Sequence, residues 1–161
     1  LASSAGLAYA SARLVEPVAS DAPIKYACCI SSAAGFEIGY RYHRNNHVGL
    51  HLGFGSFSGT MSKMYAASGP MTLTTYDIDV VLQVTGFGRL WGAGIFGAHI
   101  DDLSLPVNTP GAELGIGVGL EAGIDLVRLG RHRLGGFLRV DGRLGSSSGY
   151  GAIALGAAYR L

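Results

Sequence analysis

The longest unbroken alternation of apolar and polar positions lies between residues 113 and 126. Its even positions are leucine, isoleucine, valine or alanine, and its odd positions are glycine, glutamate or aspartate. Only an extended strand places successive side chains on opposite faces, so this segment predicts a β-strand with one apolar face. It is also long, because strands of soluble proteins centre on about five or six residues.

The same two-residue period recurs along most of the chain. It predicts strands over 36–43, 47–54, 74–84, 133–144 and 151–161, and a strand over 89–100 whose two faces the pattern does not separate. Short connections at 44–46, 85–88 and 127–132 alternate with longer ones at 55–71 and 101–112, and the loop at 145–149 is on the side of the longer ones. Short turns at one rim and longer loops at the other are the arrangement of an outer-membrane barrel.

A further strand is expected near the N-terminus. The strand at 36–43 runs from the long-loop rim to the short-turn rim, so a strand that runs in the opposite direction must precede it. Residues 5–15 are the best candidate, with Leu7, Tyr9 and Val15 on one face. The tripeptide at 8–10 also fits an A-x-A cleavage site. Removing residues 1–10 would, however, leave an odd number of strands and an open sheet edge, so we expect them to belong to the barrel.

The pattern therefore predicts a single all-β domain over 1–161, an eight-stranded antiparallel up-and-down β-barrel. Its long first loop, at about 16–34, contains the two cysteines of the chain, Cys28 and Cys29. Adjacent cysteines have neither the spacing nor the second ligand pair of a zinc site. Two free thiols, a bridge between chains and a disulfide between these neighbours remain open.

The polar face of the strands decides between a soluble barrel and a membrane barrel. A soluble lipocalin-like barrel has its apolar face inside, and its water-facing surface carries lysine, glutamate, threonine and glutamine. Here the polar face is mostly glycine, which weakens an exposed strand. Inside a narrow barrel glycine leaves room for long side chains from neighbouring strands. We therefore predict that the apolar face meets lipid and that the polar face lines the lumen.

Aromatic residues of the apolar face support this orientation. They gather near the strand ends: Phe36, Phe54 and Tyr76 toward the long-loop rim, and Tyr42 and Tyr159, with Trp91 as a further candidate, toward the short-turn rim. Aromatic girdles that flank an aliphatic band are typical of the two membrane interfaces.

Composition excludes several other classes of protein. Charged residues make up 14% of the chain and 26 of its 161 residues are glycine, against about 25% charged and about 7% glycine in soluble domains. The glycines follow no three-residue period, so the chain is not collagen-like, and no run of about 18 apolar residues predicts a transmembrane helix. A net charge of +1 without a basic stripe argues against nucleic acid as a partner.

The C-terminus adds a motif to this pattern. The segment 156–161 places glycine before aromatic and apolar residues at alternate positions, with Gly156, Tyr159 and Leu161 as its key members. The whole chain resembles the small eight-stranded outer-membrane barrels of Gram-negative bacteria, the OmpA-like and OmpX-like membrane domains. Their barrel-assembly signal has this form but usually ends in phenylalanine. The resemblance implies a bacterial outer membrane with both termini in the periplasm, contact with its lipids and lipopolysaccharide, and insertion by the barrel-assembly machinery.

Ten charged residues point into the predicted lumen, where we expect them to form a structural network of ion pairs: Glu37, Arg41, Asp77, Asp79, Glu121, Asp125, Arg133, Arg139, Asp141 and Arg143. The turn at 127–132 places Glu121 opposite residue 137 or 139. We therefore expect Arg139 to contact Glu121 or another inward carboxylate such as Asp77 or Asp79. A narrow proton or ion path is the alternative. A wide aqueous channel is not expected, because eight strands leave an interior just wide enough for side chains.

Other polar groups have weaker chemical interpretations. His43, His47 and His51 share the inward face, but the last two are about 13 Å apart along the strand, so no metal is expected. The glycines around Phe87 lack the helix that follows a phosphate loop. The set His99, Asp101, Asp102 and Ser104 could serve a lipid A-modifying enzyme, although polar residues are expected at a rim in any case.

We predict no catalytic residue, no metal and no cofactor. The expected role is structural or interactive, with the loops or outer wall engaging a protein partner in a membrane complex. A lipid A-modifying hydrolase or acyltransferase, a small pore and a soluble lipocalin-like ligand-binding barrel are the alternatives.

Overall fold

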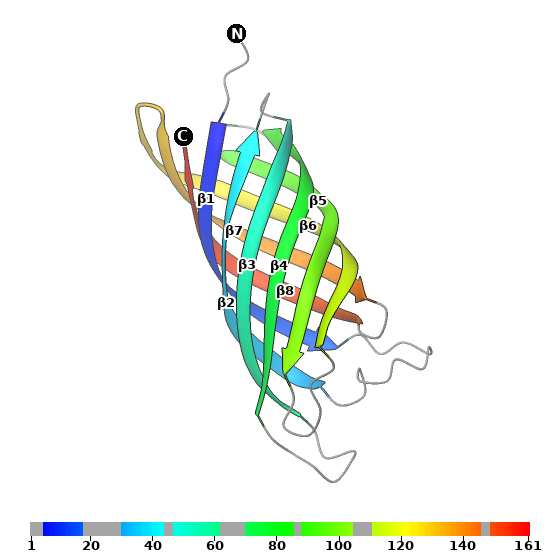
Figure 1. Cartoon of the computed structure of the whole chain (residues 1–161). Coiled ribbons are helices and arrows are strands. Elements are labelled where there is room, and N and C mark those ends of the chain that lie inside the picture. Colours follow the sequence, from blue (N-terminus) through cyan, green and yellow to red (C-terminus); the bar gives the residue numbers. More distant parts are fainter. Residues whose placement is uncertain are drawn as a thin grey trace.

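A computed structural model of the chain describes residues 5–17, 30–43, 47–61, 70–85, 88–104, 111–145 and 149–161. They form eight strands: β1 (Ala5–Pro17), β2 (Ile30–His43), β3 (Val48–Met61), β4 (Pro70–Thr85), β5 (Leu90–Ser104), β6 (Gly111–Leu129), β7 (His132–Gly145) and β8 (Gly149–Arg160). Each pairs antiparallel with its neighbours in one closed barrel (Figure 1), which confirms the predicted fold class. Within these ranges there is no helix long and apolar enough to span a membrane.

Several strands are longer than the alternation predicted. β2 begins at Ile30 and β3 ends at Met61, because serine, threonine and glycine interrupt the apolar alternation there without interrupting the hydrogen-bonded ladder. The first loop consequently begins after Pro17 and ends before Ile30, which is shorter than the predicted span of about 16–34. Cys28 and Cys29 lie outside the described residues.

β1 closes the barrel against β8. Their register runs from Leu7 opposite Arg160 to Pro17 opposite Tyr150, which confirms the predicted pairing of residues 5–15 with 151–161. The Leu161 amide also donates to the Gly6 carbonyl at 2.9 Å. Figure 1 shows the start of β1 and the end of β8 at the same end of the barrel, where the β6–β7 hairpin (gold) also projects. We call this the terminal end and the opposite one the long-loop end.

The strands are strongly staggered. Following paired residues from Leu7 around all eight strands returns to β1 at Pro17, ten positions further along. The path passes through Arg41, His51, Asp79, Gly97, Gly117, Arg143 and Tyr150. This stagger corresponds to a strand tilt of roughly 40° and a lumen just wide enough for side chains.

The faces of the strands have the predicted orientation. On β6, Leu114 and Leu120 are 70% and 72% exposed, whereas the lumen residues Glu37 and Arg41 are 1% and 0% exposed. Among the predicted girdle residues, Phe36, Phe54, Tyr76, Tyr42 and Tyr159 lie on the outer face. The molecule is therefore apolar outside and charged inside.

Trp91 departs from the predicted girdle. The inward positions of β5 are odd-numbered, so this side chain lies in the lumen and is 4% exposed. Its ring rests on Gly123 of β6, where an added Cβ would lie 2.2 Å from the indole. The glycine thus makes room for a large neighbour, which is the role expected of lumen glycines.

Apolar layers occupy the lumen near both of its ends. Toward the long-loop end the buried apolar cluster comprises Ala33, Phe57, Met71, Leu73, Leu103, Tyr150 and Ala152. Toward the terminal end a second cluster comprises Leu7, Tyr9, Trp91, Phe137 and Ala158. The register places most of the charged lumen residues between these two layers.

Candidate functional site

The charged residues of the lumen form one large cluster around Glu37. This β2 carboxylate is almost completely buried and accepts hydrogen bonds from the Tyr9 hydroxyl, Arg13 Nη1 and Arg139 Nη2. Two guanidinium groups from different strands therefore share one carboxylate. Charge-assisted bonds of this kind are among the strongest in proteins, and they link β1, β2 and β7 across the lumen.

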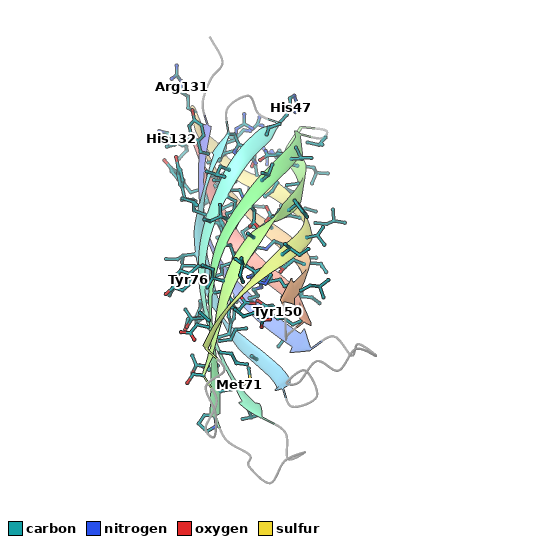
Figure 2. All side chains as sticks on the ribbon, turned by 45° about the vertical axis from the view of Figure 1, so that its right-hand side comes forward. His47, Met71, Tyr76, Arg131, His132 and Tyr150 are labelled. Carbon is teal, nitrogen blue, oxygen red and sulfur yellow. The ribbon has the colours of Figure 1, made fainter. Side chains whose placement is uncertain are left out.

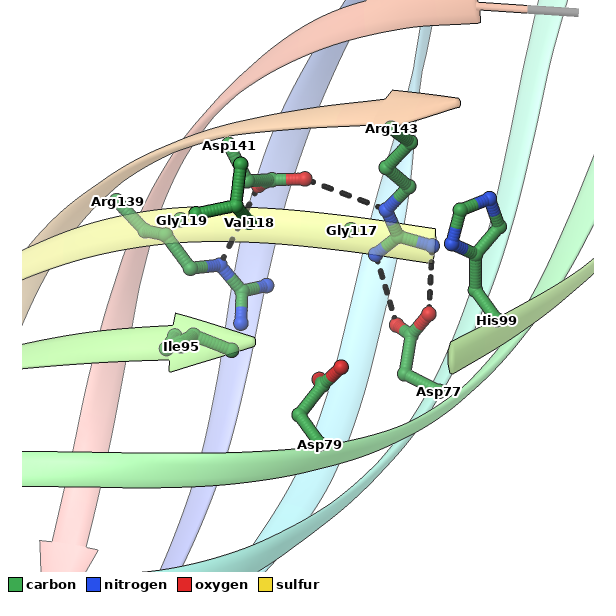
Figure 3. A pocket seen from close by; sticks show the side chains of 10 residues that line it. All are labelled: Asp77, Asp79, Ile95, His99, Gly117, Val118, Gly119, Arg139, Asp141 and Arg143. Atoms are coloured by element: carbon green, nitrogen blue, oxygen red, sulfur yellow. Dashed lines mark hydrogen bonds and ion pairs between the residues drawn. The ribbon is translucent and has the colours of Figure 1, made fainter. Parts of the chain in front are cut away.

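Asp141 extends the cluster along β7. It binds Arg13 Nη2, and it lies 3.6 Å from Arg139 Nε and 3.2 Å from Arg143 Nε. Arg143 in turn donates both terminal nitrogens to Asp77, at 2.5 and 2.8 Å (Figure 3). The cluster thus reaches β4 through alternating positive and negative groups.

Toward the long-loop end, β5 adds a histidine and a carboxylate. Asp101 accepts a hydrogen bond from the Tyr150 hydroxyl at 3.1 Å, and its other oxygen lies 3.2 Å from His99 Nε2. Arg143 Nη1 is 3.8 Å from the same carboxylate. Asp101 therefore joins the lumen network through three different side chains.

Arg41 and Glu121 form a separate bidentate pair. Both terminal nitrogens of Arg41 lie 2.6 Å from the Glu121 carboxylate. Glu121 is opposite Arg139 in the ladder, one of the two registers predicted. Of the two alternatives expected for Arg139, the contact with Glu121 is not formed. Arg139 reaches across the lumen to another inward carboxylate, Glu37.

The remaining predicted carboxylates have partners of their own. Asp79 accepts from His51 Nδ1 at 2.6 Å, and the other ring nitrogen of His51 lies 2.5 Å from the Tyr9 hydroxyl. At the terminal end, Asp125 lies 2.7 Å from Arg160 and 3.3 Å from Arg133. All ten predicted residues are therefore found in ion pairs, nine of them within the lumen and Arg133 at its terminal mouth, where the side chain is 38% exposed.

Aromatic rings support several of these guanidinium groups. Arg41 and Arg139 lie 5.3 and 5.5 Å from the centre of the Tyr9 ring, and Arg160 lies 5.1 Å from that of Trp91. Cation–π attraction strengthens when water is excluded, so these rings help to solvate charges that are remote from water.

Several members of the network were not predicted from the strand pattern: Tyr9, Arg13, His99, Asp101, Tyr150 and Arg160. The signal for Arg13 and Arg160 was their position on the inward face of their strands. Asp101 lay beyond the predicted end of its strand at 100, and the glycine- and alanine-rich sequence before it concealed which face of β5 points inward.

The alternative chemical sites do not assemble. His99 and Asp101 face the lumen, whereas Asp102 and Ser104 are exposed on the outer wall, because successive residues of a strand alternate in direction. His43 and His51 are buried in the lumen and His47 is exposed. No group of metal-ligating side chains occurs within the described ranges. Gly86 and Phe87 lie outside them.

The charged part of the lumen encloses little free space. A cavity of about 20 Å³ lies among Asp77, Asp79, His99, Arg139, Asp141 and Arg143, whose arrangement Figure 3 shows. A volume of roughly 10–15 Å³ is needed to hold one water molecule. This cavity between β4, β5, β6 and β7 therefore has space for about one.

Solved structures share this architecture. Neisserial surface protein A matches with a TM-score of 0.62 and 14% identity over 98% of this chain and 96% of that one. Ail, the attachment invasion locus protein of Yersinia pestis, matches at 0.59 and 14% over the full length of both chains. The N-terminal β-barrel domain of Pseudomonas aeruginosa OprF matches at 0.51 and 15%, over 96% of this chain and 97% of that one.

All three are eight-stranded outer-membrane barrels. The chain has the fold of this class. The resemblance inferred from the strand pattern is thus confirmed at the level of the fold. No family profile matches the chain, and no curated protein sequence matches it.

Proposed function

We propose that the protein is a bacterial outer-membrane β-barrel with a structural or interaction role. Its lumen is closed by the ion-pair network, and its loops or outer wall engage a partner. Both termini are in the periplasm, the outer wall contacts phospholipid and lipopolysaccharide, and Gly156, Tyr159 and Leu161 belong to the signal for the barrel-assembly machinery.

This proposal rests on a distribution of side chains that is the reverse of that in a soluble barrel. Charged side chains are buried and paired, while large aliphatic side chains cover the outer wall. On β6 the exposed apolar positions run from Leu114 to Leu126, which spans roughly 30 Å at the tilt of the strands. The apolar band of an outer-membrane barrel is about 25 Å tall, so this wall is suited to cross a membrane.

A closed lumen favours this role over that of a pore. The charged cluster and the two apolar layers place side chains across the lumen, and the cavity within the charged cluster has space for about one water molecule. We infer that the lumen is a stabilising plug that conducts no ions. The separation of Ser104 from His99 by the barrel wall likewise favours a protein without enzymatic activity.

Refolding tests the membrane proposal. We expect the denatured chain to fold only when detergent or lipid is added, and to migrate differently in gels before and after boiling. Trp91 is the only tryptophan, so its emission reports folding directly. A monomer that folds and stays soluble in buffer alone would contradict the proposal.

Two further measurements separate the possible roles. Planar-bilayer recordings of the refolded protein are expected to show no steady conductance, and regular channels would favour the pore instead. For the interaction role, the protein is extracted from its native membrane in mild detergent and compared in size with the refolded barrel. We expect a larger native particle, and equal sizes would contradict a stable partner.

A further inference from the structure

Within the described part of the chain, the arginines that are not buried all lie at the terminal end. Arg89 precedes β5, Arg128 is near the end of β6, and Arg131 and Arg133 flank His132 at the start of β7. Figure 2 shows Arg131, His132 and His47 at this end, with Met71 toward the other. The other described arginines are buried in the lumen. Among the described residues, accessible positive charge is therefore concentrated at this end of the barrel.

This group carries more positive than negative charge. Asp125 is the single carboxylate that the described residues place there, and it lies 2.7, 3.3 and 3.8 Å from Arg160, Arg133 and Arg128. Three guanidinium groups thus share one carboxylate. Arg89 is held beside them, since its carbonyl accepts from the Asp125 amide at 2.9 Å.

Exposed apolar residues adjoin these arginines. Leu129 is 71% exposed, Leu126 60% and Leu90 56%, and each lies within two residues of an arginine. Tyr159 of β8 contacts His132 there, with its hydroxyl 2.5 Å from the imidazole Nδ1. Arginine beside leucine and tyrosine is typical of surfaces that sit in the headgroup layer of a bilayer.

We propose that Arg89, Arg128 and Arg131, the arginine rim, bind the phosphate groups of anionic phospholipids at the terminal end of the barrel, while Arg133 stays on Asp125. A guanidinium donates two parallel hydrogen bonds that match phosphate oxygens. The neighbouring leucines favour a lipid over a soluble anion, because they would enter the acyl region when the arginines meet the headgroups. The inference rests on the proposed membrane-spanning role.

The test compares lipids that differ in headgroup charge. The refolded full-length protein in detergent is titrated with phosphatidylglycerol or phosphatidylcholine, and bound lipid is counted by native mass spectrometry. The variant Arg89→Gln/Arg128→Gln/Arg131→Gln removes three charges but leaves Arg133 and Arg160 on Asp125, so the buried carboxylate stays paired. The control Ser56→Gln/Thr72→Gln/Ser104→Gln places three glutamines on exposed outer positions at the long-loop end.

We expect the wild type and the control to prefer phosphatidylglycerol, and the arginine variant to bind it at least about tenfold more weakly. Equal binding of both lipids by the wild type, or an unchanged preference in the arginine variant, would overturn the inference. So would displacement of phosphatidylglycerol by equimolar inorganic phosphate or polyglutamate, because the site would then accept a soluble anion or an acidic protein equally well.

Insertion into vesicles tests the membrane-spanning role separately from the lipid-binding inference. Wild type and arginine variant are expected to insert equally into phosphatidylcholine vesicles, as judged by Trp91 emission and heat-modifiable migration. Insertion without a headgroup preference would overturn the lipid-binding inference alone. Failure of the wild type to insert into any vesicle would contradict the membrane role on which it rests.

Discussion

Two regions of the same three strands have opposite chemistry. In the middle of the barrel, paired inward positions of β3, β4 and β5 are Gly53, Asp77 and His99, and the outward row beside them contains Phe54 and Tyr76. Near the long-loop end, the inward row is Phe57, Leu73 and Leu103, and the outward row is Ser58, Thr72 and Ser104. The alternation of sides continues unchanged, but polar and apolar residues exchange places.

In the proposed membrane position, the surroundings of the wall, rather than the strand, determine which residues go inside. Where lipid surrounds the wall, the outside must be apolar, and charges gathered in the lumen must pair with one another. Where water surrounds the wall, hydroxyl groups face out and the lumen carries an ordinary apolar core. The exchange occurs just beyond the paired aromatic residues Phe54 and Tyr76, whose ring centres are 5.4 Å apart. We infer that the membrane boundary lies at this row.

The largest expected effect comes from breaking an ion pair in the middle region. Glu121→Gln leaves Arg41 charged and unpaired in the lumen, so we expect a loss of about 3–5 kcal/mol in the free energy of unfolding. Urea unfolding in vesicles, followed by Trp91 emission, measures it. Arg41→Met in the same chain should recover part of the loss. The control Asp102→Asn, an exposed carboxylate near the long-loop end, should change stability by less than about 0.5 kcal/mol. Equal effects at both sites would contradict a buried network.

The ion pairs show what the sequence could and could not predict. The inward direction of Glu37, Arg41 and Arg139 followed from the two-residue period, because side-chain alternation is fixed by strand geometry. The hairpin register also followed from turn length, to within one step. Partners across the lumen did not, because Arg139 and Glu37 belong to β7 and β2, which are not hydrogen-bonded neighbours. Such contacts depend on barrel stagger, which no single hairpin specifies.

The long-loop end was harder to predict for a different reason. The strands were predicted from apolar residues on one face and polar residues on the other. Near residue 55 the apolar residues change from the outward face to the inward face. The outer parts of β3 and β4 therefore resembled loop sequence, and Phe57 and Leu73 were not identified as core residues. Trp91 was misplaced because glycine and alanine on both faces of β5 removed the contrast between them.

A charge introduced on the outer wall should have a different cost in each region. Val118→Arg places a guanidinium in the aliphatic band, where we expect a destabilisation of about 2–4 kcal/mol. Thr72→Arg places the same group on the outer wall near the long-loop end, where water solvates it, and should be nearly neutral. The measurement is the free energy of unfolding in vesicles. Similar costs at both positions would mean that lipid covers both regions.

The apolar core at the long-loop end gives a smaller effect. Leu73→Ala removes a buried side chain that packs between Phe57 and Leu103, so we expect a loss of about 2 kcal/mol, at the lower end of the range for such truncations. The control is Leu82→Ala on the same strand. The native Leu82 side chain is 57% exposed and is expected to face lipid. This substitution should cost clearly less, and a larger cost for it would contradict a true core beneath the long-loop end.

The smallest expected effect locates the boundary itself. Ser56 lies two residues beyond Phe54 on the outward face of β3, and Ser58 lies two further along. If the interface is at the Phe54–Tyr76 row, Ser56→Leu extends the apolar band into the headgroup layer and should stabilise the barrel by less than about 1 kcal/mol, since a buried CH₂ contributes about 0.8 kcal/mol. Ser58→Leu would face water and should not stabilise the barrel.

The two variants are compared by urea unfolding in vesicles of two acyl-chain lengths. In the thicker bilayer, the stabilisation by Ser56→Leu should increase, whereas Ser58→Leu should gain less. Equal stabilisation at both positions in the thinner bilayer would move the boundary outward, and no effect at either would place it closer to the middle of the barrel.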